Sequence, residues 1–348
     1  PRAWPLARYN IATAMALVAA ALARLPASAA ALSLPTASAA RAPVAYRCPS
    51  CGDPLLPTSS GSLRCRNGHS VDAAREGHHH LLRRPLSAKV AEEADQVARA
   101  ARAFHDGGSF DAAADAIAAE VVRALLDGPQ PAAGRGARRE LLAAGCGDGL
   151  ILRRIERALR QRGSDLGGGG GDGSSSCGGD GGGGGGDGVC SPAVGLWGVD
   201  TAKRAVKAAA KRQPSARFAV ASPHALPFSD GCFDLVLSAF APAPWDEMCR
   251  VLRPGGAVVV ARGGPRHLRE LRALAGAPVY SEPKQVSAGQ GEKYTRLELQ
   301  RRYRGDALEA LCGMTPFCRK APRERKAALR RAADAADAAD TAAAADAD

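Results

Sequence analysis

The sequence predicts an α/β protein in which a doubly wound, largely parallel sheet follows a small metal-binding module and a helical linker region. Three observations support this fold class: a paired Cys/His pattern near residue 50, a Gly-rich turn after a strand-like run, and apolar runs that alternate with helical patterns from Leu141 onward. Such alternation is typical of a parallel sheet with helices on both faces. The 348 residues suffice for this core and one small module.

Residues 1–45 are predicted to form a targeting or disordered leader. Residues 1–52 hold five arginines and no acidic residue, and Ala, Leu, Ser and Pro dominate them. This composition favours an organelle transit peptide, with a secretory signal or a disordered leader as alternatives. The apolar run "IATAMALVAAALA" is shorter than the ~20 residues that span a bilayer, so no membrane partner is expected.

Residues 46–84 are predicted to form a zinc-binding module. The pattern Cys48-x2-Cys51, thirteen residues, Cys65-x3-His69 has the ligand number and spacing of a closed tetrahedral zinc site. Four protein ligands leave no position open for a substrate, so this zinc would be structural. The alternative is that the four residues are unrelated members of a loop.

The other cysteines and the histidine run His78–His80 give no second metal pattern. Seven of the ten cysteines are scattered, which is not typical of a disulfide scaffold and favours a reducing compartment. The histidine run has no partner cluster at ligand spacing, and a solvated helix start is the preferred interpretation.

Residues 85–139 are predicted to form a helical linker region, and residues 140–321 the sheet domain. The linker holds two helical patterns separated by "DGGS", with Ser109 as a possible N-cap. Within the sheet domain, strands are expected in residues 141–145, 195–200, 217–222, 233–241 and 257–262, and helices in residues 201–212 and 245–253. A Gly-rich insertion at 163–188 is expected to be flexible coil, and residues 322–348 a low-complexity tail.

The turn "GCGDG" is the predicted cofactor loop. Glycines such as Gly145 and Gly147 let the backbone approach a cofactor, and the following helix start attracts polar groups. Asp200 closes the next strand, where an acidic residue binds ribose hydroxyls about 20 residues beyond the loop. It lies 51 residues past Gly149, of which the insertion accounts for 26, leaving 25. Both a nicotinamide enzyme and an S-adenosylmethionine (AdoMet) methyltransferase fit these features.

Two later segments favour the methyltransferase. The stretches "ASPHALPFSDGCFDLVLS" and "RVLRPGGAVVV" resemble the third-strand loop, the fourth strand and the Pro-Gly-Gly turn of Rossmann-like methyltransferases.

From Tyr46 to about Pro322 the sequence resembles the bacterial large-subunit ribosomal RNA guanine-N1 methyltransferases, except in the Gly-rich insertion. The resemblance rests on the Cys/His quartet, "EG" at Glu76, "ARAFHDGGSF", "GCGDG", "KAAAKR", "LPFSD", "GPRHL" and "RGDALEALCGMTPF". It implies AdoMet-dependent methyl transfer to N1 of a guanine in a hairpin loop of ribosomal RNA, with structural zinc. It also implies that AdoMet contacts Phe110, Gly147, Asp148 and His267. The sequence assigns no oligomeric state.

One position departs from the methyltransferase pattern. The first strand usually ends with an acidic residue, and Ala143 stands there instead, which removes a group that steadies the Gly-rich loop or the methionine amino group. A zinc-bearing RNA-binding protein with weakened or lost methyltransferase activity is therefore the alternative function. An NAD-type oxidoreductase is a further alternative, but it leaves "GPRHL", "MTPF" and the Cys/His quartet unexplained.

Charge and composition bear on partner and location. The formal charge of +12 favours a polyanionic partner, and ribosomal RNA is expected. Basic clusters on the predicted helices at 150–162 and 201–212 are interpreted as solvated faces, whereas the run from Arg301 to Lys326 is the better candidate for phosphate contact. A eubacterial-type ribosomal RNA enzyme behind a basic, acid-free leader favours an organelle, a plastid over a mitochondrion.

No residue stands out as the base that accepts the guanine N1 proton. Asp106, His224 and His267 are candidates by residue type only.

Overall fold

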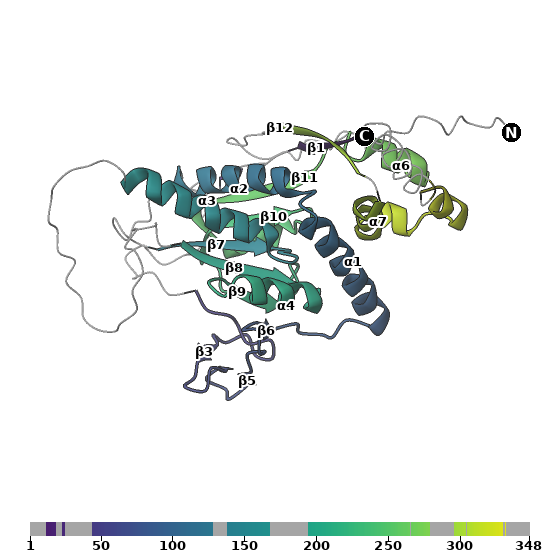
Figure 1. The fold of residues 1–348 in the computed structure, drawn as a ribbon. Helices are drawn as coiled ribbons and strands as arrows, with labels where there is room; N and C mark the ends of the chain where they lie inside the picture. The colour runs from purple at the N-terminus through teal and green to yellow at the C-terminus, as the bar shows by residue number, and fades with distance from the viewer. Residues whose placement is uncertain are drawn as a thin grey trace.

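The computed structural model describes residues 12–18, 23–24, 44–127, 138–167, 194–264, 266–278, 296–303, 305–329 and 331 (Figure 1). The predicted insertion lies outside the described residues from 168 on, and the predicted tail from 332 on. The first residues of that insertion, 163–167, are helical, because extending an existing helix costs much less than starting one.

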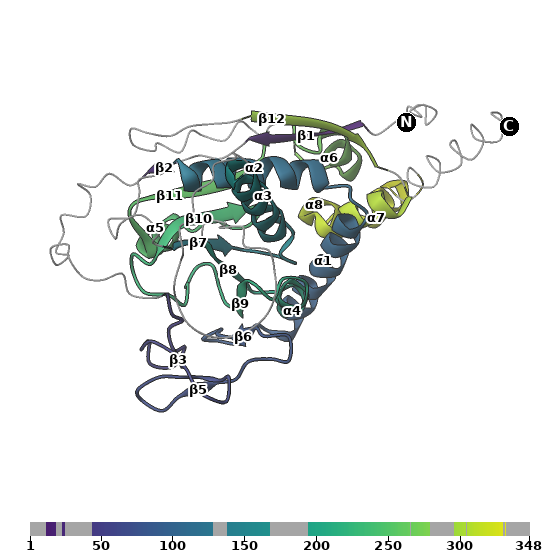
Figure 2. The ribbon, with the colours of Figure 1, turned by 60° about the vertical axis from the view of Figure 1, so that its left-hand side comes forward.

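The main sheet is the centre of the fold (Figures 1 and 2). In spatial order its strands are β12 (Arg296–Arg302), β1 (Ala12–Val18), β11 (Leu252–Gly263), β10 (Phe233–Ala239), β7 (Arg139–Ala144), β8 (Val194–Asp200), β9 (Arg217–Val220) and β6 (His79–His80), with β2 (Ala23–Arg24) beside β11. The run from β11 through β6 is parallel throughout. This confirms the predicted doubly wound α/β class.

The strand order of the parallel part of the sheet reverses between β7 and β10. From β7 the chain proceeds outward through β8 and β9 on one side, and through β10 and β11 on the other. Ligands in open α/β sheets bind beyond the carboxyl ends of the strands where the order reverses in this way. The crevice between the ends of β7 and β10 is therefore where a cofactor would bind.

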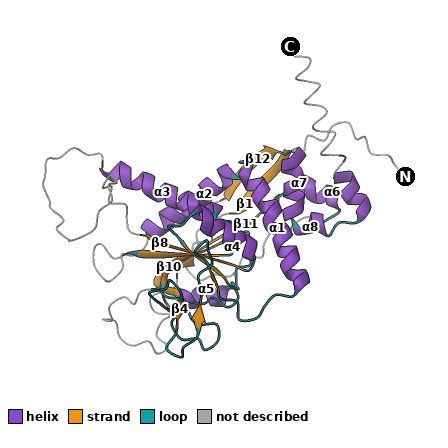
Figure 3. Ribbon diagram, turned by 60° about the horizontal axis from the view of Figure 1, so that its bottom comes forward, coloured by secondary structure: helices purple, strands orange, loops and turns teal. Residues whose placement is uncertain are grey.

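Helices cover the sheet and extend beyond it (Figure 3). They are α1 (Ala88–Asp106), α2 (Asp111–Leu126), α3 (Leu150–Gly167), α4 (Lys203–Arg212), α5 (Trp245–Val251), α6 (Arg269–Ala275), α7 (Gly305–Met314) and α8 (Pro316–Arg319). The helices α2 and α3 pack on each other over one face, and α1 packs against α7. None of the described helices is both long and apolar enough to cross a membrane.

The sheet separates two apolar cores. In β7, Leu141 and Ala143 point into the core beneath α2, α3 and α4, whereas Leu142 and Ala144 point into the other. All four side chains are at most 4% exposed. This burial on both faces explains why the strands appear in the sequence as continuous apolar runs rather than as an alternating pattern.

The second core is shared with the zinc-binding module. Its aromatic members include Trp197, Phe228 and Phe233 from the sheet domain and Tyr46 from the start of the module. The Phe228 ring lies 4.8 Å from Phe233 and 5.2 Å from Tyr46, between ring centres. Offset and edge-on contacts of this kind stabilise beyond simple area burial.

Part of the predicted leader contributes strands to the sheet. Within residues 1–45, β1 pairs antiparallel with both β11 and β12, and β2 pairs antiparallel with β11. Nine of these 45 residues thus lie in strands, because the open edge of β11 offers unpaired backbone groups that a passing strand can satisfy. The targeting role of residues 1–45 stays a prediction.

Three local predictions are wrong. The N-cap of α2 is Phe110 rather than Ser109, and it makes no side-chain capping bond. The histidine run is not a solvated helix start: His79–His80 form β6, and His78 is 4% exposed. Pairing of β6 with β9 overrides the weak local preference of three histidines. The residues of the predicted Pro-Gly-Gly turn are part of strand β11, and the register between β11 and β10 shifts at this point.

We expect the substitution Phe228→Ala to lower the free energy of unfolding by about 3–5 kcal/mol, because a fully buried ring would leave a cavity. Urea denaturation followed by far-UV circular dichroism measures the loss. Leu56→Ala is the control, since that side chain is 62% exposed and its removal should cost little. A loss below 1 kcal/mol for Phe228→Ala would contradict the packing of the second core.

Candidate metal centre and cofactor site

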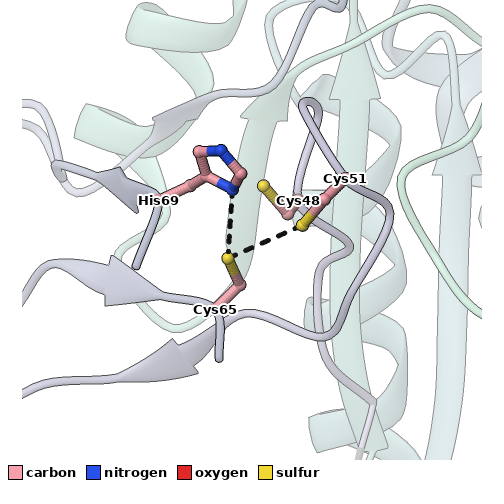
Figure 4. A group of neighbouring side chains, drawn as sticks. All are labelled: Cys48, Cys51, Cys65 and His69. Atoms are coloured by element: carbon pink, nitrogen blue, oxygen red, sulfur yellow. Dashed lines mark hydrogen bonds between the residues drawn. The ribbon is translucent and has the colours of Figure 1, made fainter. Parts of the chain in front are cut away.

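The predicted zinc ligands converge on one point in the small sheet of β3 (Leu56–Pro57), β4 (Leu63–Arg64) and β5 (Ser70–Val71). The ligand atoms of Cys48, Cys51, Cys65 and His69 all lie within 4.8 Å of one another (Figure 4). The Cys65 sulfur is 3.7 Å from the Cys51 sulfur and 3.4 Å from Nδ1 of His69. Tetrahedral zinc with Zn–S bonds of about 2.3 Å requires sulfurs about 3.8 Å apart, so the donor set fits the metal.

The two ligand turns have the backbone shape that such a site needs. Gly52 follows the first pair and Gly68 lies within the second, and both have φ near +80°. A hydrogen bond with the Asn67 side chain lowers the pKa of Cys51 to about 6, whereas burial raises the pKa of Cys65. Cys51 thus reaches the thiolate form that a metal ligand requires at neutral pH.

Both ends of the module are joined to the sheet domain. At its start, the amide of Arg47 donates to the carbonyl of Pro227 at 2.8 Å. At its end, the amide of Leu81 donates to the carbonyl of Val220 at 2.8 Å. The module is therefore held at two points near the end of β9.

The Gly-rich loop follows β7, as predicted. Gly145 has φ +81°, and a methyl group on it would overlap the Cβ of Ala241, so only glycine allows the loop to meet the chain after β10. At Gly147, φ is +54° and an added Cβ would meet no described heavy atom within 4 Å. The loop backbone at Gly147 is thus open to close approach by another group, which is the property that a cofactor loop requires.

Asp200 ends β8 and contacts this loop. Its carboxylate accepts the amide hydrogens of Gly147 and Ala202, both at 2.9 Å. Burial raises the pKa of Asp200. Each carboxylate oxygen has a second lone pair, so the group can also accept the ribose hydroxyls of AdoMet, as predicted from its strand position.

Asp148 lies at the centre of an ion-pair network. It is 5% exposed, and its carboxylate lies 3.1 Å from Nδ1 of His105 and 3.1 Å from Nη1 of Arg212. Arg212 also donates to Asp106 at 2.6 Å. Burial opposes ionisation of Asp148, but hydrogen bonding with His105 and nearby positive charge outweigh it and lower the pKa. Asp148 thus joins the loop to α1 and α4.

Phe110 and His267, predicted to contact AdoMet, both pack against a third ring. Phe240, directly after β10, meets Phe110 edge-on at 5.6 Å and lies nearly parallel to His267 at 5.9 Å, between ring centres. Phe110 is 5% and His267 8% exposed. Burial lowers the pKa of His267 to about 4, so its ring is neutral at pH 7.

Ala143 stands where the sequence departs from the methyltransferase pattern, and it is buried between Gly198 and Leu237 of the neighbouring strands. The loop is held by other groups. The amides of Gly145 and Cys146 both donate to the carbonyl of Val199, and Asp200 accepts from the loop as described above. Hydrogen bonds to Val199 and Asp200 therefore hold the loop backbone without an acidic residue at position 143.

The three candidate bases have different surroundings. Asp106 is bound by Arg212, and although burial opposes its ionisation, the hydrogen bonds and charges of Arg212 and Arg102 together lower its pKa. His224 is exposed and lines a cavity of about 240 Å³ beside the zinc-binding module. The buried Nδ1 of His267 has no hydrogen-bond partner among the described residues.

The basic clusters on α3 and α4 are largely used within the fold. Arg154 pairs with Asp111 and Asp115 of α2, and Arg204 pairs with Asp95 of α1. These cations join helices, so the interpretation of both clusters as solvated faces is wrong for Arg154, whose side chain is only 17% exposed. The expected phosphate contact of the run from Arg301 to Lys326 stays a prediction.

Sequence reasoning missed three residues of the site: Phe240, His105 and Arg212. His105 lies in "ARAFHDGGSF", which the resemblance includes, so that segment was the available signal. Nothing in the sequence marks the contact between Arg212 and Asp148, which are 64 residues apart.

The fold, the cofactor loop and the metal centre together define a Rossmann-like methyltransferase with an amino-terminal zinc ribbon. Two family models match: "RlmA, N-terminal", a zinc ribbon, over residues 46–90, and "Methyltransferase domain" over residues 180–260. Among curated relatives, the "Putative 23S rRNA (guanine-N(1)-)-methyltransferase" of Micromonospora griseorubida is 32% identical over 235 residues, covering 65% of this chain and 68% of that protein. The chain belongs to the family of 23S ribosomal RNA guanine-N1 methyltransferases.

Two further comparisons define the extent of the similarity. The "23S rRNA (guanine(748)-N(1))-methyltransferase" of Streptomyces fradiae is 33% identical over 226 residues, and the match spans 65% of this chain and 65% of that protein. A solved structure of phosphoethanolamine N-methyltransferase 2 from Haemonchus contortus has a TM-score of 0.26 at 17% identity, covering 41% of this chain and 27% of that one. The fold assignment rests on the strand order and not on this structure.

The low pKa of His267 predicts a pH dependence of stability. Its pKa is about 4 in the folded chain and 6.5 ordinarily, so the unfolded chain takes up the proton first as the pH falls. Stability that is fully present above pH 6.5 should be lost between pH 6.5 and 4, by about 3 kcal/mol. Urea denaturation at pH 7.5 and 4.5 should show a smaller loss for His267→Gln than for the wild type. Equal losses would show that His267 is not buried as a neutral ring.

Proposed function

We propose that this protein transfers a methyl group from AdoMet to N1 of a guanine in a hairpin loop of large-subunit ribosomal RNA. The observation that carries the proposal is the zinc centre with tetrahedral donor spacing in a chain whose sheet also forms the cofactor crevice. Both parts occur in one family, to which this chain belongs. Because this family consists of methyltransferases, the alternative of an NAD-type oxidoreductase has no support.

The residues of the crevice position two reactants. When bound, AdoMet would supply an electrophilic methyl group to guanine N1, its carbon–sulfur electron pair would remain on sulfur, and the N1 proton would be released to solvent. In this proposal the cofactor would lie over Gly147, where an added Cβ would meet no described atom, and Asp200 would accept its ribose hydroxyls. Phe110 and His267 would contact the cofactor from their packed positions against Phe240. Holding the reactants in line supplies much of the acceleration in such reactions.

The zinc-binding module supports recognition of RNA. Between it and the loop after β9 lies the cavity of about 240 Å³, lined by the cations Arg47, Arg83 and Arg250 and by His224. Guanidinium groups bind phosphate and stack on bases, which suits a chain with only 4% aromatic residues. The module would thus form one wall of a cleft that holds an RNA loop against the methyl donor.

We further propose an organelle location, with a plastid favoured over a mitochondrion. The basic, acid-free composition of residues 1–52 supports it, as does the eubacterial origin of the relatives' ribosomal RNA substrate.

Ala143 favours one second candidate, a zinc-bearing RNA-binding protein with weakened or lost methyltransferase activity. Calorimetric titration with AdoMet distinguishes the two functions. Micromolar affinity supports the methyltransferase, and no binding at high micromolar cofactor supports the binding protein.

For the methyltransferase we expect Asp200→Asn to weaken AdoMet binding at least tenfold, because the amide loses a charged acceptor for the ribose hydroxyls. Asp115→Asn on α2 is the matched control and should keep wild-type affinity. Methylation is then followed on organellar large-subunit ribosomal RNA hairpins, with mass spectrometry locating the modified guanine. Wild-type protein that binds AdoMet but modifies no guanine would contradict the proposed function.

Removal of zinc should separate the two binding events. We expect a strong chelator to lower RNA affinity at least tenfold while AdoMet affinity stays within about twofold, because the ligands lie outside the cofactor crevice. Restoring zinc should restore RNA binding. Equal loss of both affinities would instead show that zinc maintains the whole fold.

A further inference from the structure

Predicted cofactor contacts lie beyond the ends of β7 and β8 and also beside the chain that follows β10. Gly145, Gly147 and Asp200 lie at the ends of β7 and β8, whereas Phe110 and His267 contact Phe240, directly after β10. A methyl group added to Gly145 would overlap Ala241, so the chain after β10 lies against the cofactor loop. The methyl acceptor of the proposed function must reach this junction, and Phe240 is an exposed residue there.

Phe240 stands at this junction in a strained conformation. Its φ is +53°, in the left-handed region that bulky residues rarely adopt, and its side chain is 42% exposed. Its amide donates to the carbonyl of Ala261 at 2.9 Å, and the buried Ser238 hydroxyl donates to the carbonyl of Ala241 at 3.2 Å. The surrounding bonds thus fix the backbone in this strained form, which is characteristic of functional positions.

The ring of Phe240 is supported but not covered. Phe110 contacts it edge-on and His267 lies nearly parallel to it, so the ring is held in one orientation. Phe104 and Phe110 are by contrast buried. Phe240 thus combines a fixed orientation with 42% exposure, which leaves part of the residue free to contact a ligand.

Few other exposed side chains in the described part of the chain are large and apolar enough to stack on a base. The exposed large apolar side chains there are Leu56, Val90, Phe240 and Trp245. Both aromatic ones lie at the ends of one segment, "FAPAPW", whose two prolines restrict its backbone. An extruded base needs an aromatic or apolar surface to replace the stacking that it loses.

We propose that Phe240 is the stacking platform for the target guanine, which it holds in plane beside the cofactor loop. This proposal rests on the function proposed above and adds a substrate-binding residue to it. Stacking is tolerant of base identity, so Phe240 would position the guanine and leave its recognition to other groups.

The test uses full-length, zinc-loaded protein and the ribosomal RNA hairpin that the wild type methylates. Phe240→Asn removes the ring and tolerates the left-handed backbone, and Phe240→Leu keeps apolar bulk without a ring. We expect single-turnover methylation to fall about 10- to 100-fold in both. AdoMet affinity should stay within twofold and the melting temperature within a few degrees. Phe240→Tyr, which keeps the ring, should stay within threefold of the wild-type rate.

Val90→Ala, on α1, is the control for loss of an exposed apolar side chain and should methylate at the wild-type rate. Wild-type rates in both ring-less variants would overturn the stacking role. So would a loss of AdoMet affinity equal to the loss of rate, which would make Phe240 part of the cofactor wall. If the wild type binds AdoMet and methylates no hairpin, the proposed function is wrong, and so is the proposed stacking role of Phe240.

Discussion

A parallel sheet must bury both of its faces, and this protein covers the second face partly with its metal-binding module. Tyr46, Cys48 and Cys65 belong to the same apolar cluster as Trp197 and Phe228 of the sheet domain. Two of the predicted zinc ligands thus belong both to the ligand set and to the core that the module shares with the sheet domain. The position of the module against the second face of the sheet follows from this packing.

In the cofactor loop, hydrogen bonds to other residues replace the acidic residue that is missing at the end of the first strand. With Ala143 at the end of β7, the loop depends on backbone bonds to Val199 and on the carboxylate of Asp200. The nearby Asp148 instead joins the loop to α1 and α4 through His105 and Arg212. The helical linker region is thus part of the site's support rather than a spacer between two domains.

The sheet elements and the metal centre could be predicted from the sequence because both depend on short-range patterns. The apolar runs that became β7, β8, β9, β10 and β11 reflect burial on two faces, and ligand pairs two to four residues apart mark zinc turns. Contacts between distant segments leave no such pattern. The exposure of Phe240 depends on where Phe110 and His267 fold, and β6 formed from histidines only because β9 offered it a partner.

The attachment of the module at Arg47 and Leu81 has a consequence for metal affinity. Since both ends bond to the chain around β9, the segment between them forms a closed loop even before an ion arrives. Much of the entropy lost in bringing four ligands together is already lost on folding of the sheet domain. The ligands thus face the ion at a high effective concentration, and the larger domain preorganises the smaller one for metal.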